Sequence, residues 1–121
     1  MEPTKENEAF ERGVELFNGR KFFEAHEVWE EIWLRAPEPE KTLLQGFIQI
    51  AAAFHHWQRA NASGAKSLLS AGIAKLETCP AGFHGIDAAN LRAEARGCLT
   101  AFGTRDEPGL SELPKIQKLR G

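Results

Sequence analysis

Turn-forming and helix-breaking residues divide this chain into stretches whose apolar residues recur at helical spacing, and that pattern limits the fold most. The breaks fall at Asn18-Gly19, at Pro37 and Pro39, at 61–64, at 79–82 and after Gly103. No stretch alternates apolar and polar residues as a half-buried strand does. We therefore predict an all-α protein, a single bundle of about five helices in short-looped hairpins that resemble tetratricopeptide hairpins.

The expected boundaries follow from the same breaks. The predicted helices span about 4–17, 21–34, 40–59 and 65–77, and a fifth, capped by Asp87, runs through Phe102. We expect one helical domain over 1–121, with a core at about 10–103 and an extended tail at 104–121 that Leu113 and Ile116 order in part. A repeat array is not predicted, because only one tetratricopeptide-like unit is clear and an array needs about three.

Charge balance and cysteine content exclude several classes of protein. The chain has 15 Lys and Arg against 17 Asp and Glu, whereas nucleic-acid-binding domains usually carry a basic excess, so no nucleic-acid partner is expected. Cys79 and Cys98 are too few for a secreted disulfide scaffold and the first residues are polar, so we expect a cytoplasmic protein. The most apolar stretch, GFIQIAAAF, is too short to cross a bilayer, so no membrane partner is expected; a homo-oligomer is left open.

The stretch FFEAHEVWEEIW, residues 22–33, combines aromatic and acidic residues around one histidine. At 100° per residue, Glu24, Glu27 and Glu31 form one stripe that is predicted to face water. His26 and Glu30 fall inside the apolar arc instead, and their spacing of four lets them touch. We predict that both look inward, and because a buried charge is costly unless it is paired, their placement implies a pair, a further partner or an opening to solvent.

The next predicted helix offers partners for that pair. Leu44, Ile48, Ala51 and His55 share one side of it, and Gln45, Gln49 and His56 form a polar stripe beside them. An antiparallel hairpin would place His26 and Glu30 opposite these polar residues. The pocket would be walled by Trp29, Trp33 and Trp57, with Asn61 at one end of the hairpin.

Three interpretations of this cluster remain open. It is a satisfied buried network, or metal-free acid–base chemistry by His26 oriented by Glu30, or a metal site. In the metal site, His26, Glu30 and one of His55 and His56 would hold one divalent ion, and a bound water would be the nucleophile of a hydrolysis. His26 and Glu27 would then be the catalytic residues, with Glu27 as base only if the helix leans toward the cleft.

A non-enzymatic alternative uses the same residues. In it, the tryptophan-lined groove between the two helices binds a peptide or a partner helix. Outside this cluster, His84 in GFHG is expected to be an exposed loop residue.

Two segments carry a resemblance to a known family. FNGRKFFEAHEVWEEIW and LLQGFIQIAAAFHHWQRANASGAKSLL contain E-x-H-E-x-x-E-x-x-W, Q-G-x-I-Q and N-x-x-G-A in that order. Together they resemble, over about residues 17–76, the small prokaryotic helical proteins grouped as domain of unknown function 309. The resemblance implies an all-α bundle, and members are sometimes labelled predicted metal-dependent hydrolases. The family pattern falls on Glu24, His26, Glu27, Glu30, Trp33, Gln45, Gly46, Gln49, His55, His56, Asn61 and Gly64.

Overall fold

The computed structural model describes residues 5–119, and within them the predicted all-α architecture is confirmed. The helices are α1 (Lys5–Asn18), α2 (Phe22–Trp33), α3 (Glu40–Gln58), α4 (Ala62–Lys75) and α5 (Ala88–Ala101). Short 3₁₀ turns follow at η1 (Leu76–Thr78), η2 (Phe83–Gly85) and η3 (Leu110–Glu112). The predicted start of the first helix at Thr4 lies outside the described residues.

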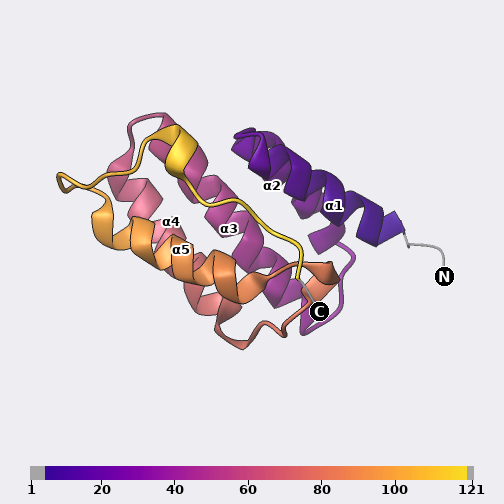
Figure 1. The fold of residues 1–121 in the computed structure, drawn as a ribbon. Helices are drawn as coiled ribbons and strands as arrows, with labels where there is room; N and C mark the ends of the chain where they lie inside the picture. Colours follow the sequence, from indigo (N-terminus) through magenta and orange to yellow (C-terminus); the bar gives the residue numbers. More distant parts are fainter. Residues whose placement is uncertain (1–4, 120–121) are drawn as a thin grey trace.

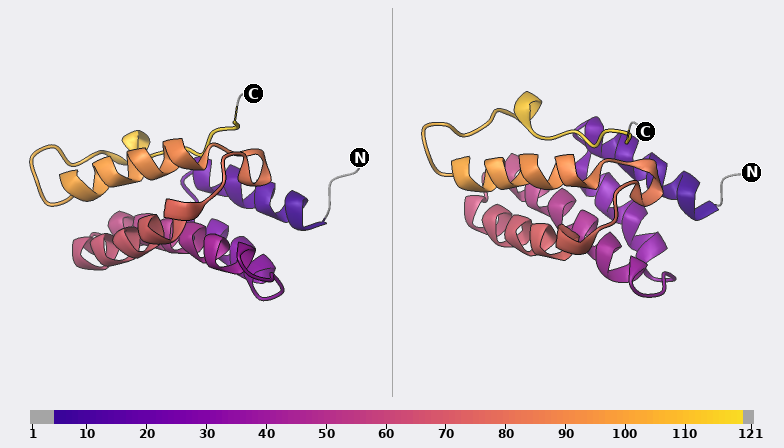
Figure 2. Two further views of the ribbon diagram at one scale, coloured as in Figure 1. Left: turned by 90° about the horizontal axis from the view of Figure 1, so that it is seen from below. Right: turned by 60° about the horizontal axis from the view of Figure 1, so that its bottom comes forward.

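Consecutive helices form hairpins, and the last part of the chain returns across them. α1 contacts α2, α2 contacts α3, and α3 contacts α4, while α5 contacts α4 (Figure 1). Figure 2 shows α1, α5 and the C-terminal segment on one side of α3 and α4. In the described chain no helix is long and apolar enough to cross a membrane.

The start of α4 differs most from the sequence-based expectation, for a local reason. α4 begins at Ala62, three residues earlier than predicted, because the side chain of Asn61 caps it. Asn61 Oδ1 accepts a hydrogen bond of 3.0 Å from the backbone N–H of Gly64, which satisfies one of the free donors in the first turn. The residues read as a turn are therefore the cap and first turn of the helix.

The core is built on aromatic side chains from the first three helices. Trp29 is fully buried and stacks on Phe10 with ring centroids 5.6 Å apart, and Phe47 packs on both rings. Phe17, Phe22 and Phe54 form the adjoining part of the same cluster. Leu113 and Ile116 of the tail are 3% and 4% exposed, which confirms that they order this segment.

The close contact between α3 and α4 depends on the absence of a side chain at Gly72. A Cβ at this position would lie 2.8 Å from the carbonyl oxygen of Gly46 and 2.8 Å from Ile50 Cγ1. The first of these is a backbone atom, so the helices would have to separate. We expect Gly72→Ala to lower the free energy of unfolding by about 1–3 kcal/mol, measured by urea denaturation.

Gly97 on α5 is the matched control, because a Cβ there would meet nothing within 4 Å. Gly97→Ala should raise the free energy of unfolding by up to about 1 kcal/mol through helix propensity alone. Equal effects at both positions would contradict the close approach of α3 and α4.

Candidate functional site

The predicted polar cluster on α2 is only partly inward. Glu24, Glu27 and Glu31 are exposed, which confirms the acidic stripe. The prediction for Glu30 is wrong, because its side chain is 51% exposed and meets His26 at the surface, with 3.1 Å between His26 Nε2 and Glu30 Oε2. The buried side of α2 consists of Phe22, Ala25, Trp29 and Ile32. Glu30 stands about 120° from the middle of that arc, so it belongs to the rim.

The four expected metal ligands do not converge. Within residues 5–119, no group of three His, Cys, Asp or Glu side chains could hold a metal ion. Phe23 contacts both His26 and His55, with ring centroids 5.9 and 5.2 Å apart. His56 turns to the next hairpin instead, where its Nδ1 lies 3.1 Å from Asn61 Nδ2. The predicted combination of His26 and Glu30 with one of the paired histidines is therefore not assembled in this arrangement.

Burial and neighbouring positive groups oppose protonation of His55. The pKa of His55 is lowered below its ordinary value, first by burial and then by the nearby charges of Arg59, His56 and His26. The neutral imidazole is thus favoured at His55, so its contact with Phe23 is that of two uncharged rings.

The predicted pocket walled by three tryptophans is also wrong, because each tryptophan has a different environment. Trp29 is part of the core and donates a hydrogen bond of 3.1 Å from Nε1 to the Phe10 carbonyl oxygen. Trp57 stacks on Phe102 with ring centroids 4.1 Å apart. Trp33 is half-buried, with Lys41 Nζ 4.4 Å from the centre of its ring. Only Trp33 therefore stays beside the polar residues of α2 and α3.

Three buried polar atoms on α2 and α3 have no hydrogen-bond partner. Within the described residues there are four such side-chain atoms, and three of them are His26 Nδ1, Trp33 Nε1 and Gln49 Oε1. The two α2 residues are seven apart and so share one side of that helix, and α3 packs against α2. We call His26, Glu30, Trp33 and Gln49, with the half-buried Gln45 beside them, the α2–α3 face.

Two large apolar side chains flank the α2–α3 face. Phe23 is 46% exposed and Leu34 is 66% exposed. In the described residues only one further large apolar side chain, Leu119, is comparably exposed. At 100° per residue Phe23 and Leu34 lie at almost the same angle around the axis of α2, next to Glu30. The face thus combines unpartnered polar atoms with uncovered apolar surface.

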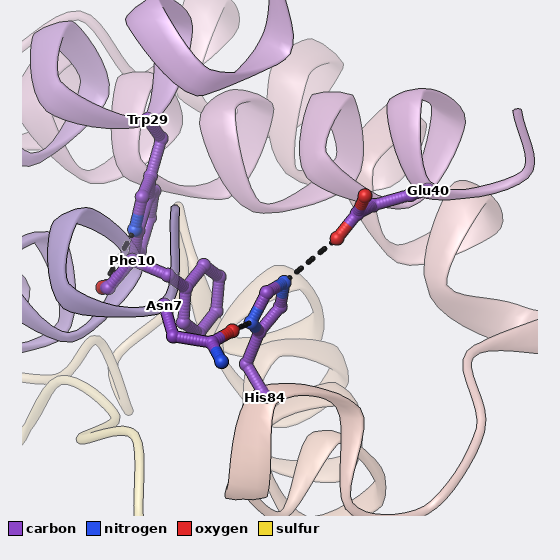
Figure 3. A network of polar contacts seen from close by, with 5 residues as sticks. All are labelled: Asn7, Phe10, Trp29, Glu40 and His84. Atoms are coloured by element: carbon purple, nitrogen blue, oxygen red, sulfur yellow. Dashed lines mark hydrogen bonds and ion pairs between the residues drawn. The ribbon is translucent and has the colours of Figure 1, made fainter. Parts of the chain in front are cut away.

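His84 forms a second polar cluster that the sequence did not predict. The expectation of an exposed loop residue is wrong. Its side chain is 10% exposed and its ring stacks on Phe10 with centroids 4.6 Å apart. Nδ1 lies 2.5 Å from Asn7 Oδ1, and Nε2 lies 2.9 Å from Glu40 Oε1 (Figure 3). Positive φ angles at Gly82, His84 and Gly85 turn the loop so that the imidazole points inward. Two glycines around Phe83-His84 were the only sequence signal.

This histidine borders a cavity of about 560 Å³, which we call the His84 pocket. Its wall is mixed in charge and polarity, and consists of Lys5, Asn7, Ala9, Glu31, Ile32, Arg35, Ala36, Pro37, Glu40 and His84. Both ring nitrogens of His84 are already engaged, by residues from α1 and α3. His84 therefore joins three elements rather than offering a free base.

The two histidine–glutamate pairs should differ in their effect on stability. We expect His84→Ala to lower the free energy of unfolding by about 2–3 kcal/mol, through the loss of two hydrogen bonds and one ring stack. Glu30→Ala should change it by less than about 0.5 kcal/mol, because the pair it forms is exposed. Chemical denaturation measures both. A large destabilisation by Glu30→Ala would contradict the exposed position of the Glu30 carboxylate.

Comparison with known proteins places the chain among relatives without a stated activity. The model of the family described as "Domain of unknown function (DUF309)" matches residues 10–68. The uncharacterized protein YpuF of Bacillus subtilis (strain 168) is 42% identical over 65 residues, 53% of this chain and 37% of that protein. An uncharacterized protein of Aquifex aeolicus (strain VF5) is 29% identical over 91 residues, 74% of this chain and 27% of that protein. The chain thus spans well under half the length of these curated relatives.

A solved structure supports the fold. The crystal structure of a conserved hypothetical protein from Thermus thermophilus has a TM-score of 0.66 with this chain at 36% sequence identity. The similarity covers 95% of that chain and 75% of this one.

Proposed function

The chain belongs to the family described as a domain of unknown function (DUF309), and we propose that it is a non-enzymatic binding module whose ligand occupies the α2–α3 face. One observation carries the proposal: His26 Nδ1, Trp33 Nε1 and Gln49 Oε1 are buried without a partner in the described residues. Buried polar atoms in native proteins are almost always hydrogen-bonded, and each exception costs about 1–3 kcal/mol. A molecule that displaced the side chains covering these atoms and supplied the missing partners would recover that free energy.

The unpartnered atoms specify the kind of group that fits. Trp33 Nε1 can only donate a hydrogen bond, Gln49 Oε1 can only accept one, and His26 Nδ1 can do either. An amide group has both a carbonyl oxygen and an N–H, so it is the simplest match to Trp33 and Gln49 together. The exposed Phe23 and Leu34 would add apolar contacts. A peptide segment of a protein partner combines these properties.

Two other assignments have less support. Metal-assisted hydrolysis needs converging ligands and a base, but Glu27 is exposed on the acidic stripe and Glu30 is exposed beside His26. Small-molecule binding in the His84 pocket has the cavity of about 560 Å³ in its favour. Its central polar groups, however, bond to one another, whereas those of the α2–α3 face do not.

A substitution at Gln49 tests whether the unpartnered side-chain oxygen of this residue lowers the free energy of unfolding. We expect Gln49→Leu to raise the free energy of unfolding by about 1 kcal/mol, because it removes a buried acceptor that has no partner. Gln45→Leu, in the same stripe but without a buried unpartnered atom, is the control and should change stability by less than about 0.5 kcal/mol. Urea denaturation measures both. Destabilisation by Gln49→Leu would mean that the amide is satisfied and that the face is ordinary core.

Binding of an amide can be followed at the tryptophans themselves. In a ¹H–¹⁵N spectrum, we expect the indole N–H signal of Trp33 to shift when N-methylacetamide is added, because this donor is free. The signal of Trp29, whose Nε1 already donates to Phe10, is the internal control and should stay in place. The shift should be smaller in Gln49→Leu, which removes the acceptor for the same ligand. Equal shifts at both tryptophans would argue against a site on this face.

A further inference from the structure

The C-terminal segment, residues 111–119, lies between the end of α1 and the start of α5 (Figures 1 and 2). From here on, the tail means residues 111–119 alone. The residues that hold its backbone form the tail-binding surface, which consists of Asn18, Arg20, Gly85 and Asp87. Their contacts join residues more than 90 positions apart at the α1 end. The tail is held both through hydrogen bonds to its main chain and through burial of Leu113 and Ile116, as an extended peptide ligand is held by a receptor.

Asn18 binds the tail as a neighbouring strand would. Its Nδ2 donates a hydrogen bond of 3.0 Å to the carbonyl oxygen of Ile116, and its Oδ1 accepts one of 2.7 Å from the N–H of the same residue. An antiparallel strand makes this pair of bonds with its own main chain. One side-chain amide therefore recognises an extended residue regardless of its side chain.

Arg20 holds the preceding carbonyl groups. Its guanidinium donates to the carbonyl oxygens of Ser111, Leu113 and Pro114 at 3.2, 2.6 and 3.0 Å. The backbone of Arg20 has a φ of 67° because Arg20 lies in the left-handed cap that ends α1, where the N–H of Lys21 donates to the carbonyl oxygen of Leu16 at 2.8 Å and the N–H of Arg20 donates to that of Phe17 at 3.0 Å. This cap places the Arg20 side chain at the end of α1, beside the tail.

The other end of the tail is bound by main-chain groups before α5. The N–H of Asp87 donates to the carbonyl oxygen of Gln117 at 2.7 Å, and the N–H of Leu119 donates to the carbonyl oxygen of Gly85 at 3.0 Å. Between the two ends, Leu113, Pro114 and Ile116 are buried, while their neighbours are exposed. The side-chain requirement of the surface is thus aliphatic–Pro–x–aliphatic.

The segment that tethers the tail is loosely packed. Residues 103–109 are exposed apart from the half-buried Pro108. Cavities of about 270 and 500 Å³ separate this tether from α5 and from the end of α3. The tail is therefore attached through a part of the chain that contributes little burial, while Leu113 and Ile116 of the tail itself pack into the core.

We propose that the tail-binding surface is a recognition site for extended aliphatic–Pro–x–aliphatic segments of a partner protein, and that the chain's own tail is a built-in competitor. A short tether, residues 103–109, holds its segment at an effective concentration of about 1 mM, which exceeds that of any second copy of the chain. The tail therefore occupies its own surface until a partner segment with better contacts displaces it. This site is separate from the α2–α3 face, so each can be tested without the other.

The test uses a fluorescent peptide with the sequence of residues 110–119 and the full chain. In one variant, Leu113→Asp and Ile116→Asp together weaken the internal tail. We expect this chain to bind the peptide roughly 100-fold more tightly than the natural chain. This factor is the effective concentration of the internal tail, about 1 mM, divided by a dissociation constant of about 10 μM for the free peptide. Adding Asn18→Leu should weaken binding about 10-fold or more, because two hydrogen bonds are lost. Fluorescence anisotropy measures each constant, and a scrambled peptide is the control.

Several results would overturn the proposal. They are equal dissociation constants for the natural chain and the Leu113→Asp, Ile116→Asp variant, a dissociation constant that Asn18→Leu does not change, and binding of the scrambled peptide. A dimer in sedimentation would assign the surface to a second copy's tail instead. Hydrogen exchange of the natural chain gives a measurement that needs no variant. The amide hydrogens of Ile116 and Leu119 should exchange faster than that of Ile50 in α3. If all three exchange only through global unfolding, the tail does not dissociate separately and the proposal is wrong.

Discussion

Burial of the Trp29 indole is the interaction on which the rest of the structure depends. The ring stacks on Phe10, its N–H donates to the Phe10 carbonyl oxygen, and Phe47 packs against it in a T-shaped contact. Gly13 makes this possible, because a Cβ at that position would overlap the indole. One side chain thus sets how α1 lies on α2 and how both meet α3. Phe10 in turn stacks on His84, so the same contact positions the loop before α5.

The His84 pocket, the tail-binding surface and the α2–α3 face differ in whether their polar groups have hydrogen-bond partners. Asn7, His84 and Glu40 come from three elements and bond to one another, so they close the His84 pocket from within. The tail-binding surface is satisfied as well, because the chain supplies its own peptide. The α2–α3 face alone combines several buried atoms that lack partners in the described residues. A complete network stabilises the folded chain, whereas the incomplete one is the basis of the ligand site proposed at the α2–α3 face.

Much of the fold could be predicted from local patterns, and much of the site could not. The helices, the acidic stripe of Glu24, Glu27 and Glu31, and the ordering of the tail by Leu113 and Ile116 follow from periodicity and apolar character. Glu30 was placed inside because helical geometry gives an angle but not the width of the buried arc. His84 was placed outside because only the turn between Gly82 and Gly85 directs it toward Phe10. Asn18 and Arg20 offered no signal, since their partners lie more than 90 residues away. The extent of the domain over 1–121 stays a prediction.

The sequence by itself determined that this chain is helical, where its helices end, and which residue types face the core. Those properties depend on neighbours within about a turn of helix and on the burial of apolar surface, which short stretches encode. Only the tertiary structure decided which polar groups find partners. Hydrogen bonding requires atoms from distant parts of the chain to meet within about 3 Å, and spacing along the sequence does not set that distance. The same physical reason separates His84, which is fully engaged, from Trp33 and Gln49, which are not.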